Sequence, residues 1–320
     1  MTDGLKAVAG SKLKVFLQKM TKNRWTSLLA GTGITAVIQS SSVTTVLAVG
    51  FVSAGLMTFE STIGIILGAN IGTTITAQII AFKITKASWL MIAVGFLFSA
   101  IFSNKTIKNT GVIVMGLGLV FLGMNVMSDA TAPLKSYEPF ISLMEGLDNY
   151  FIGILLGALF TAIVQSSSAT TGVVIVMATQ GLIGTEAGIA VILGANIGTC
   201  VTAVLSALGK PTSAMRVAVA HVLIKVIGVA LWLAFIDQLA DIVKYISGGN
   251  AAREIANAHT VFNVVNTFFF IWLVHPMAKL IKWLVRDKKH KISPIFPNLD
   301  DYYLENPELA LDLSEKCIIK

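Results

Sequence analysis

The sequence contains two copies of one unit, and the second copy follows the first at a spacing of 126 residues without a gap. The motif Q-S-S-S begins at Gln39 and again at Gln165, and the motif L-G-A-N-I-G-T begins at Leu67 and again at Leu193. From Gly55 to Ala77, 14 of 23 positions are identical in the second copy. Identity at this level exceeds what shared hydrophobicity produces, so the chain is an internal duplication.

The composition indicates that both copies fold in a bilayer. Hydrophobic residues make up 55% of the 320 residues, charged residues only 13%, and the mean hydropathy is +0.78. So few polar side chains cannot cover a soluble globule of this size. The net charge of +7 does not indicate nucleic-acid binding, because the cations lie in short clusters between apolar runs, as in membrane proteins. We therefore expect an all-α polytopic membrane protein with the lipid bilayer as its surroundings.

The charges that flank the two copies predict that the copies are inverted. Residues 1–24 carry six cations and one acid, a net charge of +5, whereas residues 127–150 carry one lysine and four acids, a net charge of −3. By the positive-inside rule the first flank is cytoplasmic and the second is external. Following the loops onward places the C-terminal tail in the cytoplasm, with Lys83 and Lys86 as a mild violation on the outside. The sequence thus predicts two inverted repeats in the cell membrane.

Residues 27–57 are too short to cross the membrane twice. Each half has about 15 residues, which span roughly 22 Å as a helix, whereas the hydrocarbon core is roughly 30 Å thick. We expect a re-entrant helical hairpin with its tip at residues 39–42. Residues 150–183 repeat this pattern from the other face, so the two hydroxyl-rich tips are expected to meet near the middle of the membrane.

The run that follows each hairpin is expected to be a discontinuous transmembrane helix. Residues 60–82 are long enough to cross, but Gly68, Asn70 and Gly72 lie near the middle of the run. Such an interruption frees carbonyl groups that can bind a cation and helix N-termini that suit an anion. Residues 186–208 have the same pattern. The pairing of a hairpin tip with a broken helix, present twice, is the main functional signal.

The charges and the lengths of the apolar runs together predict the organisation of the whole chain. It comprises a basic amphipathic cytoplasmic segment (1–26), repeat 1 (27–109, with hairpin 27–57, broken helix 60–82 and helix 88–103), repeat 2 (110–236, with helix 110–127, hairpin 150–183, broken helix 186–208 and helix 214–236), a final transmembrane helix (258–284) and a cytoplasmic tail (285–320). The helix at 110–127 has no counterpart ahead of Met1, so we expect that a first membrane helix is missing.

The paired motifs resemble those of the type II sodium-dependent phosphate cotransporter family, and the resemblance covers residues 1 to about 290. It implies a symporter of inorganic phosphate and not an enzyme, with sodium ions as the co-transported ions and no organic cofactor. Carried over residue by residue, it implies binding of substrate and ions at Gln39, Ser40, Ser41, Ser42, Thr45, Asn70, Thr73, Gln165, Ser166, Ser167, Ser168, Thr171, Asn196 and Thr199. Sodium is implied at Gln39, Ser42, Asn70, Thr73, Gln165, Ser168, Asn196 and Thr199, with the individual assignment left open. Thr44 and Thr170 are weaker candidates.

The chemistry of these residues is consistent with that function. Hydroxyl and N–H groups can donate to phosphate oxygens, while amide and hydroxyl oxygens suit a hard cation. No Arg or Lys stands in the motifs, so a doubly charged anion in a site of low dielectric needs co-bound sodium, which gives a reason for coupling. Relatives whose cycle moves net charge carry an Asp where this chain reads Lys83-Ile-Thr-Lys86, so the sodium stoichiometry stays open.

Several polar residues outside the motifs admit two interpretations. Family members tend to carry A-H-x-x-x-N after each broken helix, whereas this chain has His221 and Lys225 there and the related His259 further on. Lys225 is expected near mid-membrane, where an ionisable residue is a functional candidate. We nevertheless favour a structural role for Lys225, and hydrogen bonding between helices for the two histidines. Glu60 and Glu186 fall at helix starts, where a carboxylate favours the helix dipole.

Two other function classes were weighed against transport of phosphate with sodium. An intramembrane serine hydrolase would use Ser40 or Ser41 as nucleophile and His221 or His259 as base. Duplication of the whole serine cluster argues against it, because catalysis needs one activated serine beside one base. The other class is an anion channel, or a carrier of another oxyanion or small carboxylate. As partners, a homodimer is left open, and residues 297–311 resemble the entry to a PhoU-like regulatory domain.

Overall fold

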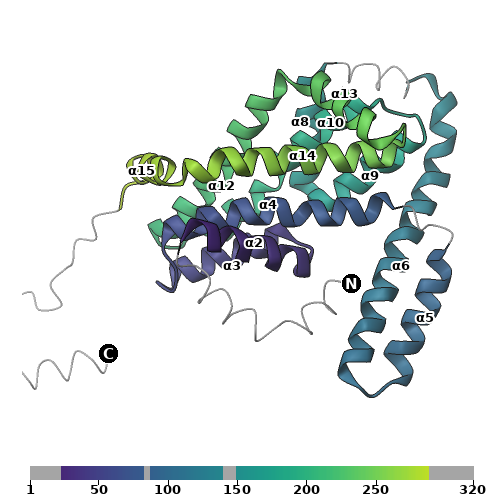
Figure 1. Ribbon diagram of the computed structural model, residues 1–320, viewed down its shortest axis with the longest axis horizontal. Helices are drawn as coiled ribbons and strands as arrows, with labels where there is room; N and C mark the ends of the chain where they lie inside the picture. Colours follow the sequence, from purple (N-terminus) through teal and green to yellow (C-terminus); the bar gives the residue numbers. More distant parts are fainter. Residues whose placement is uncertain (1–22, 83–86, 140–148, 288–320) are drawn as a thin grey trace, which may run out of the picture. The chain divides into compact units, whose positions relative to one another are not determined.

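The computed structural model describes residues 23–82, 87–139 and 149–287, and the described residues are helical without any strand (Figure 1). Contacts divide the chain into Met1–Val285 and Arg286–Lys320, and all described helices belong to the first unit. Several predicted segments lie wholly or partly outside the described residues. They are most of the basic segment 1–26, the Lys83 and Lys86 pair, residues 140–148 of the acidic flank, and the tail from 288 with its PhoU-like segment.

Two short helix pairs stand where the hairpins are predicted. The first pair is α2 (Arg24–Ile38) and α3 (Ser41–Ser53), and the second is α8 (Tyr150–Val164) and α9 (Ser167–Thr179). Arms of 15 and 13 residues reach roughly 22 and 20 Å, less than the hydrocarbon thickness. The predicted helix–turn–helix form is therefore present in both copies, whereas its insertion into a membrane stays a prediction.

The predicted interruption of residues 60–82 is wrong, because α4 runs without a break from Phe59 to Ala81. The glycines serve close packing against α2 instead. A Cβ atom on Gly68 would lie 2.7 Å from the backbone nitrogen of Thr32, and one on Gly72 would lie 2.6 Å from the Cβ of Thr35. The missing side chains thus let two helix backbones approach each other while the α4 backbone stays helical.

The second copy shows only a minor irregularity at the corresponding place. Here α10 (Thr185–Gly198) is followed at once by α11 (Cys200–Ala207), and Thr199 between them keeps the helical angles φ −61° and ψ −21°. Its backbone N–H still bonds the carbonyl of Ala195 at 3.2 Å. The two helices together form a 23-residue apolar span, Thr185–Ala207, and not two separated half-helices.

The close approach of α2 to α4 is reproduced by α8 and α10. A Cβ on Gly31 would clash with the backbone of Ile65, and a Cβ on Gly157 would clash with the backbone of Val191. These residues correspond at the spacing of 126. The internal duplication is therefore visible in the packing of the helices, while the inversion of the copies stays a prediction.

Four helices of the described residues are long and apolar enough to cross a membrane. They are α4, the α10–α11 span, α12 (Thr212–Leu233), and α6 (Lys105–Thr131) together with the 3-10 helix η2 (Ala132–Ser136). By contrast α5 (Ser88–Ile101), expected to cross at 88–103, has only 14 residues, or roughly 21 Å. It packs against α6 through mutual close contact of Gly95 and Gly111.

The final helix is not a single crossing over 258–284. Instead α14 (Ala251–Trp272) ends near Leu273, and α15 (Val274–Leu284) continues at an angle of 78°. Pro276 explains the bend, because its ring would clash with the carbonyl of Trp272 if the helix continued. The amphipathic helix α13 (Ile236–Ser247) was not predicted, although its buried residues Ile236, Leu239, Ala240 and Val243 have helical spacing.

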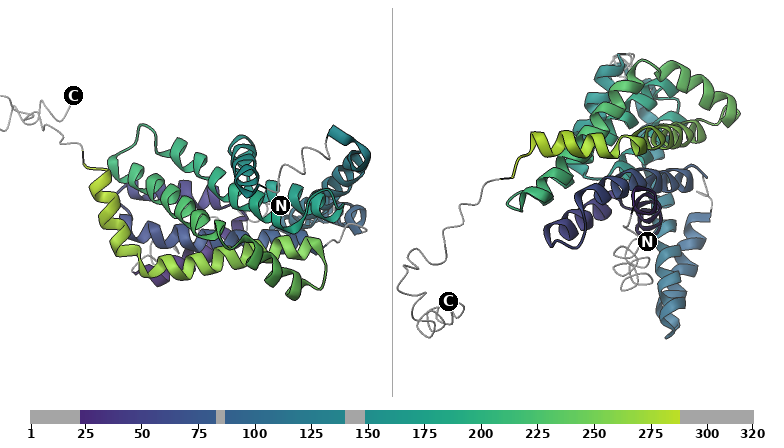
Figure 2. Two further views of the ribbon diagram at one scale, coloured as in Figure 1. Left: turned by 90° about the horizontal axis from the view of Figure 1, so that it is seen from above. Right: turned by 60° about the vertical axis from the view of Figure 1, so that its left-hand side comes forward.

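The two halves of the duplication pack crosswise. Figures 1 and 2 show α14 running alongside α4, and contacts join these two helices. The first hairpin helix pair shares a buried apolar cluster with α11 and α12 of the second copy, whereas α9 packs against α4, α6 and α14. This exchange brings residues of both Q-S-S-S turns to one cavity.

Candidate functional site

The two Q-S-S-S turns have the same backbone geometry. Gln39 (φ 60°) and Gln165 (φ 58°) are the non-glycine residues with positive φ in the described part of the chain. Each donates its backbone N–H at 2.7 Å, to Thr35 and Thr161 respectively, and thereby ends the first helix of its pair. A non-glycine residue in this region carries a cost of order 1–3 kcal/mol, and such residues cluster at functional sites. The duplicated strain therefore marks both turns as a candidate site.

The serine after each glutamine begins the next helix. Ser40 accepts a hydrogen bond from the backbone nitrogen of Val43 at 3.3 Å, and Ser166 accepts one from Ala169 at 3.2 Å. These are N-cap contacts, which satisfy backbone donors at the helix start. Both serines thus shape the turn, and neither hydroxyl donates a hydrogen bond to another described residue.

A buried threonine pair ties the two arms of each hairpin together. The hydroxyls of Thr35 and Thr44 lie 2.8 Å apart, and those of Thr161 and Thr170 lie 2.7 Å apart. Thr44 and Thr170, the weaker ligand candidates, are thus engaged inside their hairpins. The same two-threonine bond in both copies holds the tips in a fixed geometry.

A cavity of about 380 Å³ joins the two tips. Gln39 and Thr76 line it from the first copy, Ser166 and Ser168 line it from the second, and α6 closes one side with apolar residues such as Met124. Thr76 donates to the Oε1 atom of Gln39 at 2.7 Å, and the Gln39 Nε2 group bonds the Ala36 carbonyl. The cavity therefore brings hydroxyl and amide groups from both repeats to one place.

Three of the fourteen predicted residues line this cavity, namely Gln39, Ser166 and Ser168. The other eleven are not among its lining residues. Thr76 was missed by the sequence reasoning, although its position three residues after Thr73 places both on one face of α4.

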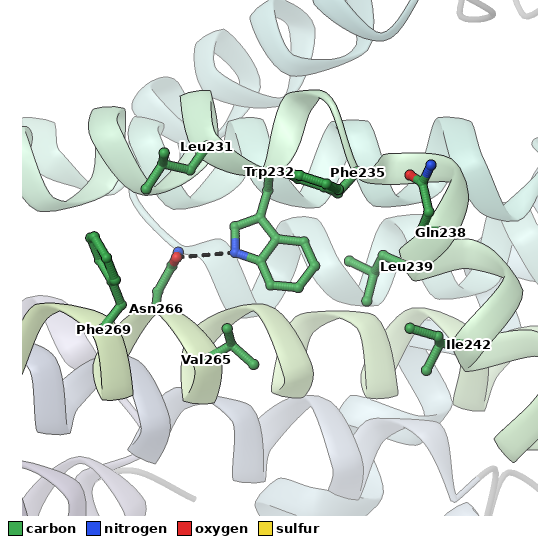
Figure 3. A pocket seen from close by; sticks show the side chains of 9 residues that line it. All are labelled: Leu231, Trp232, Phe235, Gln238, Leu239, Ile242, Val265, Asn266 and Phe269. Carbon is green, nitrogen blue, oxygen red and sulfur yellow. Dashed lines mark hydrogen bonds between the residues drawn. The ribbon is translucent and has the colours of Figure 1, made fainter.

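A second cavity of about 370 Å³ lies between α12, α13 and α14 and is apolar in character (Figure 3). Its polar lining residues are Trp232, Gln238 and Asn266, and the indole N–H of Trp232 donates to Asn266 at 3.0 Å. None of the predicted residues lines it. It is therefore not the candidate site.

The paired asparagines are buried in the helices that follow the hairpins. Asn70 lies in α4 and Asn196 in α10. The side-chain amide of Asn196 donates to the carbonyl of Ile192 at 3.1 Å, and its Oδ1 atom accepts a hydrogen bond from the Lys225 ammonium at 2.6 Å. Lys225 of α12 thus contacts a predicted site residue that lies 29 residues earlier in the chain. The sequence did not predict this contact.

The predicted threonines divide into bonded and unbonded groups. Thr73 and Thr199 donate to the carbonyls of Ala69 and Ala195, each at 2.8 Å. Thr171 donates to Ser167 at 2.8 Å, whereas the buried hydroxyl oxygen of its counterpart Thr45 has no hydrogen-bond partner in the described part of the chain. The first copy therefore leaves unsatisfied a buried oxygen whose counterpart in the second copy is bonded.

The remaining candidates have contacts of their own. His221 and His259 are buried in α12 and α14, and their Nδ1 atoms have no partner within the described ranges. Glu60 in the first turn of α4 pairs with Lys282 of α15 at 2.6 Å, while Thr58 supplies the N-cap of α4. Glu186 pairs in the same way with Lys244 of α13. The duplicated glutamates therefore join the starts of α4 and α10 to the two amphipathic helices.

Comparison with known proteins agrees with the duplicated motifs. The profile described as Na+/Pi-cotransporter matches residues 1–129 and 140–250. The Bacillus subtilis protein YqeW is 34% identical over 286 residues, which cover 89% of this chain and 92% of YqeW. No solved structure matches the chain.

Two further relatives carry names that mention phosphate. The Escherichia coli protein named "Putative inorganic phosphate export protein YjbB" is 29% identical over 310 residues, 96% of this chain but only 57% of YjbB. Human sodium-dependent phosphate transport protein 2B is 40% identical over 139 residues, 42% of this chain and 20% of that protein. With several helices able to cross a membrane, the chain is a multi-pass membrane protein that belongs to the Na+/Pi-cotransporter family.

Proposed function

We propose that the protein is a sodium-coupled symporter that takes up inorganic phosphate by alternating access. The observation that carries the proposal is the cavity of about 380 Å³ in which Gln39 of the first tip faces the same space as Ser166 and Ser168 of the second. A site shared by two repeats suits a transporter whose repeats move relative to each other around bound substrate.

The lining of the cavity suits an oxyanion with accompanying cations. The hydroxyl groups of Ser166 and Ser168 can donate to phosphate oxygens, whereas the Thr76 hydroxyl proton is held by Gln39. The Gln39 amide, which accepts from Thr76 and donates to Ala36, keeps one further N–H donor and one further acceptor lone pair. None of the lining residues is charged. A doubly charged anion in such a site needs compensation, which co-bound sodium supplies, so substrate and ion are expected to bind together.

The duplicated packing supports two moving units. The α2–α4 and α8–α10 pairs are held by backbone contacts at their glycines, so each pair is expected to move as a rigid body. The flanking charges of the two copies favour opposite orientations in the membrane. Each re-entrant hairpin would then approach the shared cavity from its own side of the cell membrane, with the C-terminal tail in the cytoplasm.

The direction of transport follows from the ion gradient in this proposal. Sodium is higher outside most cells, so coupled movement would carry phosphate inward. The name of YjbB, in contrast, refers to phosphate export by that protein. Assays in both directions therefore belong to the test.

Uptake of labelled phosphate into proteoliposomes containing the purified chain tests the proposal. We expect at least tenfold faster uptake with an inward sodium gradient than with potassium or lithium, and efflux when the gradient is reversed. The double variant Ser166→Ala with Ser168→Ala should lose most uptake, whereas Ser99→Ala on the exposed part of α5 should not. Sodium-independent uptake would contradict the proposal, and equal competition by sulfate would favour a carrier of another oxyanion.

A further inference from the structure

We propose that the ammonium group of Lys225 takes the place of one sodium ion beside Asn196, so that phosphate moves with sodium bound on the side of the first repeat alone. The inference rests on the proposed function and concerns the ion sites of the same transporter. It concerns how many sodium ions accompany each phosphate.

The first support is the contact itself. The Lys225 ammonium lies 2.6 Å from the Oδ1 atom of Asn196. An amide oxygen is the type of ligand that a sodium ion would use, and here a tethered cation already occupies it. Asn196 corresponds to Asn70 at the spacing of 126, so the lysine fills one of two equivalent positions.

The second support is the isolation of this charge. Lys225 is the fourteenth of the 22 residues of α12 and is only 7% exposed. No ion pair joins Lys225 to a carboxylate within the described residues, in contrast to Lys244, which pairs with Glu186, and Lys282, which pairs with Glu60. A buried cation without an anion is costly, so an anionic substrate bound nearby would be stabilised by it.

The third support is that the first repeat lacks an equivalent cation. The position that corresponds to Lys225 is Ser99, which lies in α5 and bonds the carbonyl of Phe96. That helix packs against α6. In addition the buried hydroxyl oxygen of Thr45 has no hydrogen-bond partner among the described residues, whereas Thr171 is bonded within its own helix. The first repeat thus keeps an unbonded oxygen at Thr45, while the second has its Asn196 acceptor occupied.

Together these contacts assign different ion chemistry to two similar sites. A sodium ion crosses the membrane with the substrate and then dissociates, whereas the ammonium group stays attached to the protein throughout the cycle and carries no ion across. Replacing Lys225 by a neutral residue would reopen the position beside Asn196 to a second ion. The number of sodium ions moved per phosphate should then rise.

The direct test compares the wild type with Lys225→Gln in proteoliposomes, using ²²Na and ³²P together. We expect the sodium-to-phosphate ratio and the Hill coefficient for sodium to rise by about one in Lys225→Gln. Phosphate uptake at low sodium should fall about tenfold and recover at high sodium. Lys225→Arg, which keeps the charge, should retain the wild-type ratio, and so should Lys244→Gln, which removes an exposed lysine of α13.

A matched pair of variants tests the same point without changing the lysine. Asn70→Ala should raise the sodium concentration for half-maximal uptake about tenfold, because it removes an ion ligand. Asn196→Ala should leave that concentration within about twofold, because no sodium binds there. This pair decides the matter if Lys225→Gln does not elute as a folded protein from a sizing column.

The outcomes separate the inference from the function on which it rests. Wild-type uptake that does not depend on sodium would overturn both the proposed function and the inference. Sodium-coupled uptake in the wild type, with an unchanged ratio in a folded Lys225→Gln or an equal loss of sodium affinity in Asn70→Ala and Asn196→Ala, would overturn the inference alone.

Discussion

In the first repeat α2 lies against α4, and in the second α8 lies against α10, with corresponding residues at the closest contacts. Gly68 meets the backbone of Leu28 and Thr32, and Gly194 meets the backbone of their counterparts, Ile154 and Ala158. By contrast, corresponding polar residues of the two repeats have different hydrogen-bond partners. Asn196 is bonded to a lysine and Thr171 to its own helix, whereas the Thr45 hydroxyl oxygen has no partner among the described residues.

The comparison shows which features of the duplication are required by folding and which are free to diverge. Helix contacts at glycine leave no space for side chains, so both copies must keep them. A polar group that faces a site is constrained by what binds there, and one side can use a tethered charge where the other uses an ion. The proposal thus assigns different ion sites to two similar backbones.

The largest effect is expected from substitutions at the glycine contacts that the α2–α4 and α8–α10 pairs share. Gly68→Leu and Gly194→Leu should each destabilise the protein by about 3 kcal/mol or more, because the new side chain must displace a helix backbone. The size should be similar in the two copies, since the contacts correspond. Loss of the folded peak on a sizing column and a lowered melting temperature in detergent would measure it.

Gly172→Val is the matched control for this pair. No atom lies within 4 Å of a Cβ added at Gly172, and the first copy already carries Val46 at the corresponding position. We expect a melting temperature close to that of the wild type. Tolerance of Leu at only one of Gly68 and Gly194 would contradict the equivalence of the two helix pairs.

A smaller effect should separate the two sides of the site. Thr45→Val removes a buried oxygen that has no partner in the described ranges, whereas Thr171→Val removes a hydroxyl bonded to the carbonyl of Ser167. If the Thr45 oxygen is an ion ligand, its loss should weaken sodium dependence about tenfold, equivalent to about 1.4 kcal/mol. Thr171→Val should change it less than about twofold. Equal effects in sodium-titrated phosphate uptake would argue against unequal ion sites.

The threonine pairs should show equal and moderate effects. Thr35→Val and Thr161→Val each remove one side of a buried hydroxyl bond of 2.8 or 2.7 Å. Loss of such a bond costs about 1 kcal/mol, and a partner left unsatisfied adds to this. Thr44 and Thr170 keep a bond to the carbonyl of the serine at their own helix start, which limits the added cost. Melting temperatures should fall by similar amounts, and a fall in only one variant would show that one hairpin is not tied this way.

Much of the fold was predictable because it depends on local sequence. The short hairpin arms follow from the spacing of polar tips and apolar runs, and the structure has helix pairs at these places. The bend after α14 was also recoverable, since Pro276 cannot follow Trp272 in a straight helix. The local signal was present, although it was not used.

The error at α4 has a different origin. A run such as G-A-N-I-G is compatible with a broken helix and with a helix that packs closely on another. The spacing of Gly64, Gly68 and Gly72 at every fourth residue places them on one face, which favours packing. Only the position of α2 decides between the two interpretations, and that position is a long-range property.

The candidate site was predictable only in the part that depends on local sequence. Both tips could be identified from the Q-S-S-S repeats, and Gln39, Ser166 and Ser168 lie on one cavity. The contact of Lys225 with Asn196 and the participation of Thr76 depend on how helices from different parts of the chain lie together. Sequence spacing gives no measure of such contacts.

The smallest expected effect concerns the duplicated ion pairs at the helix starts. Lys244→Met and Lys282→Met should each cost less than about 1 kcal/mol, because both pairs are partly exposed. The hydrogen bond to Glu186 raises the pKa of Lys244, so this pair should stabilise the folded state below the ordinary lysine pKa and cease to do so as the pH rises through the raised value. The melting temperatures of wild type and Lys244→Met should therefore differ slightly at pH 8 and converge at strongly alkaline pH. A difference that persists undiminished at alkaline pH would show that the lysine stabilises α13 by packing of its stem and not by its charge, since only the charge is lost there.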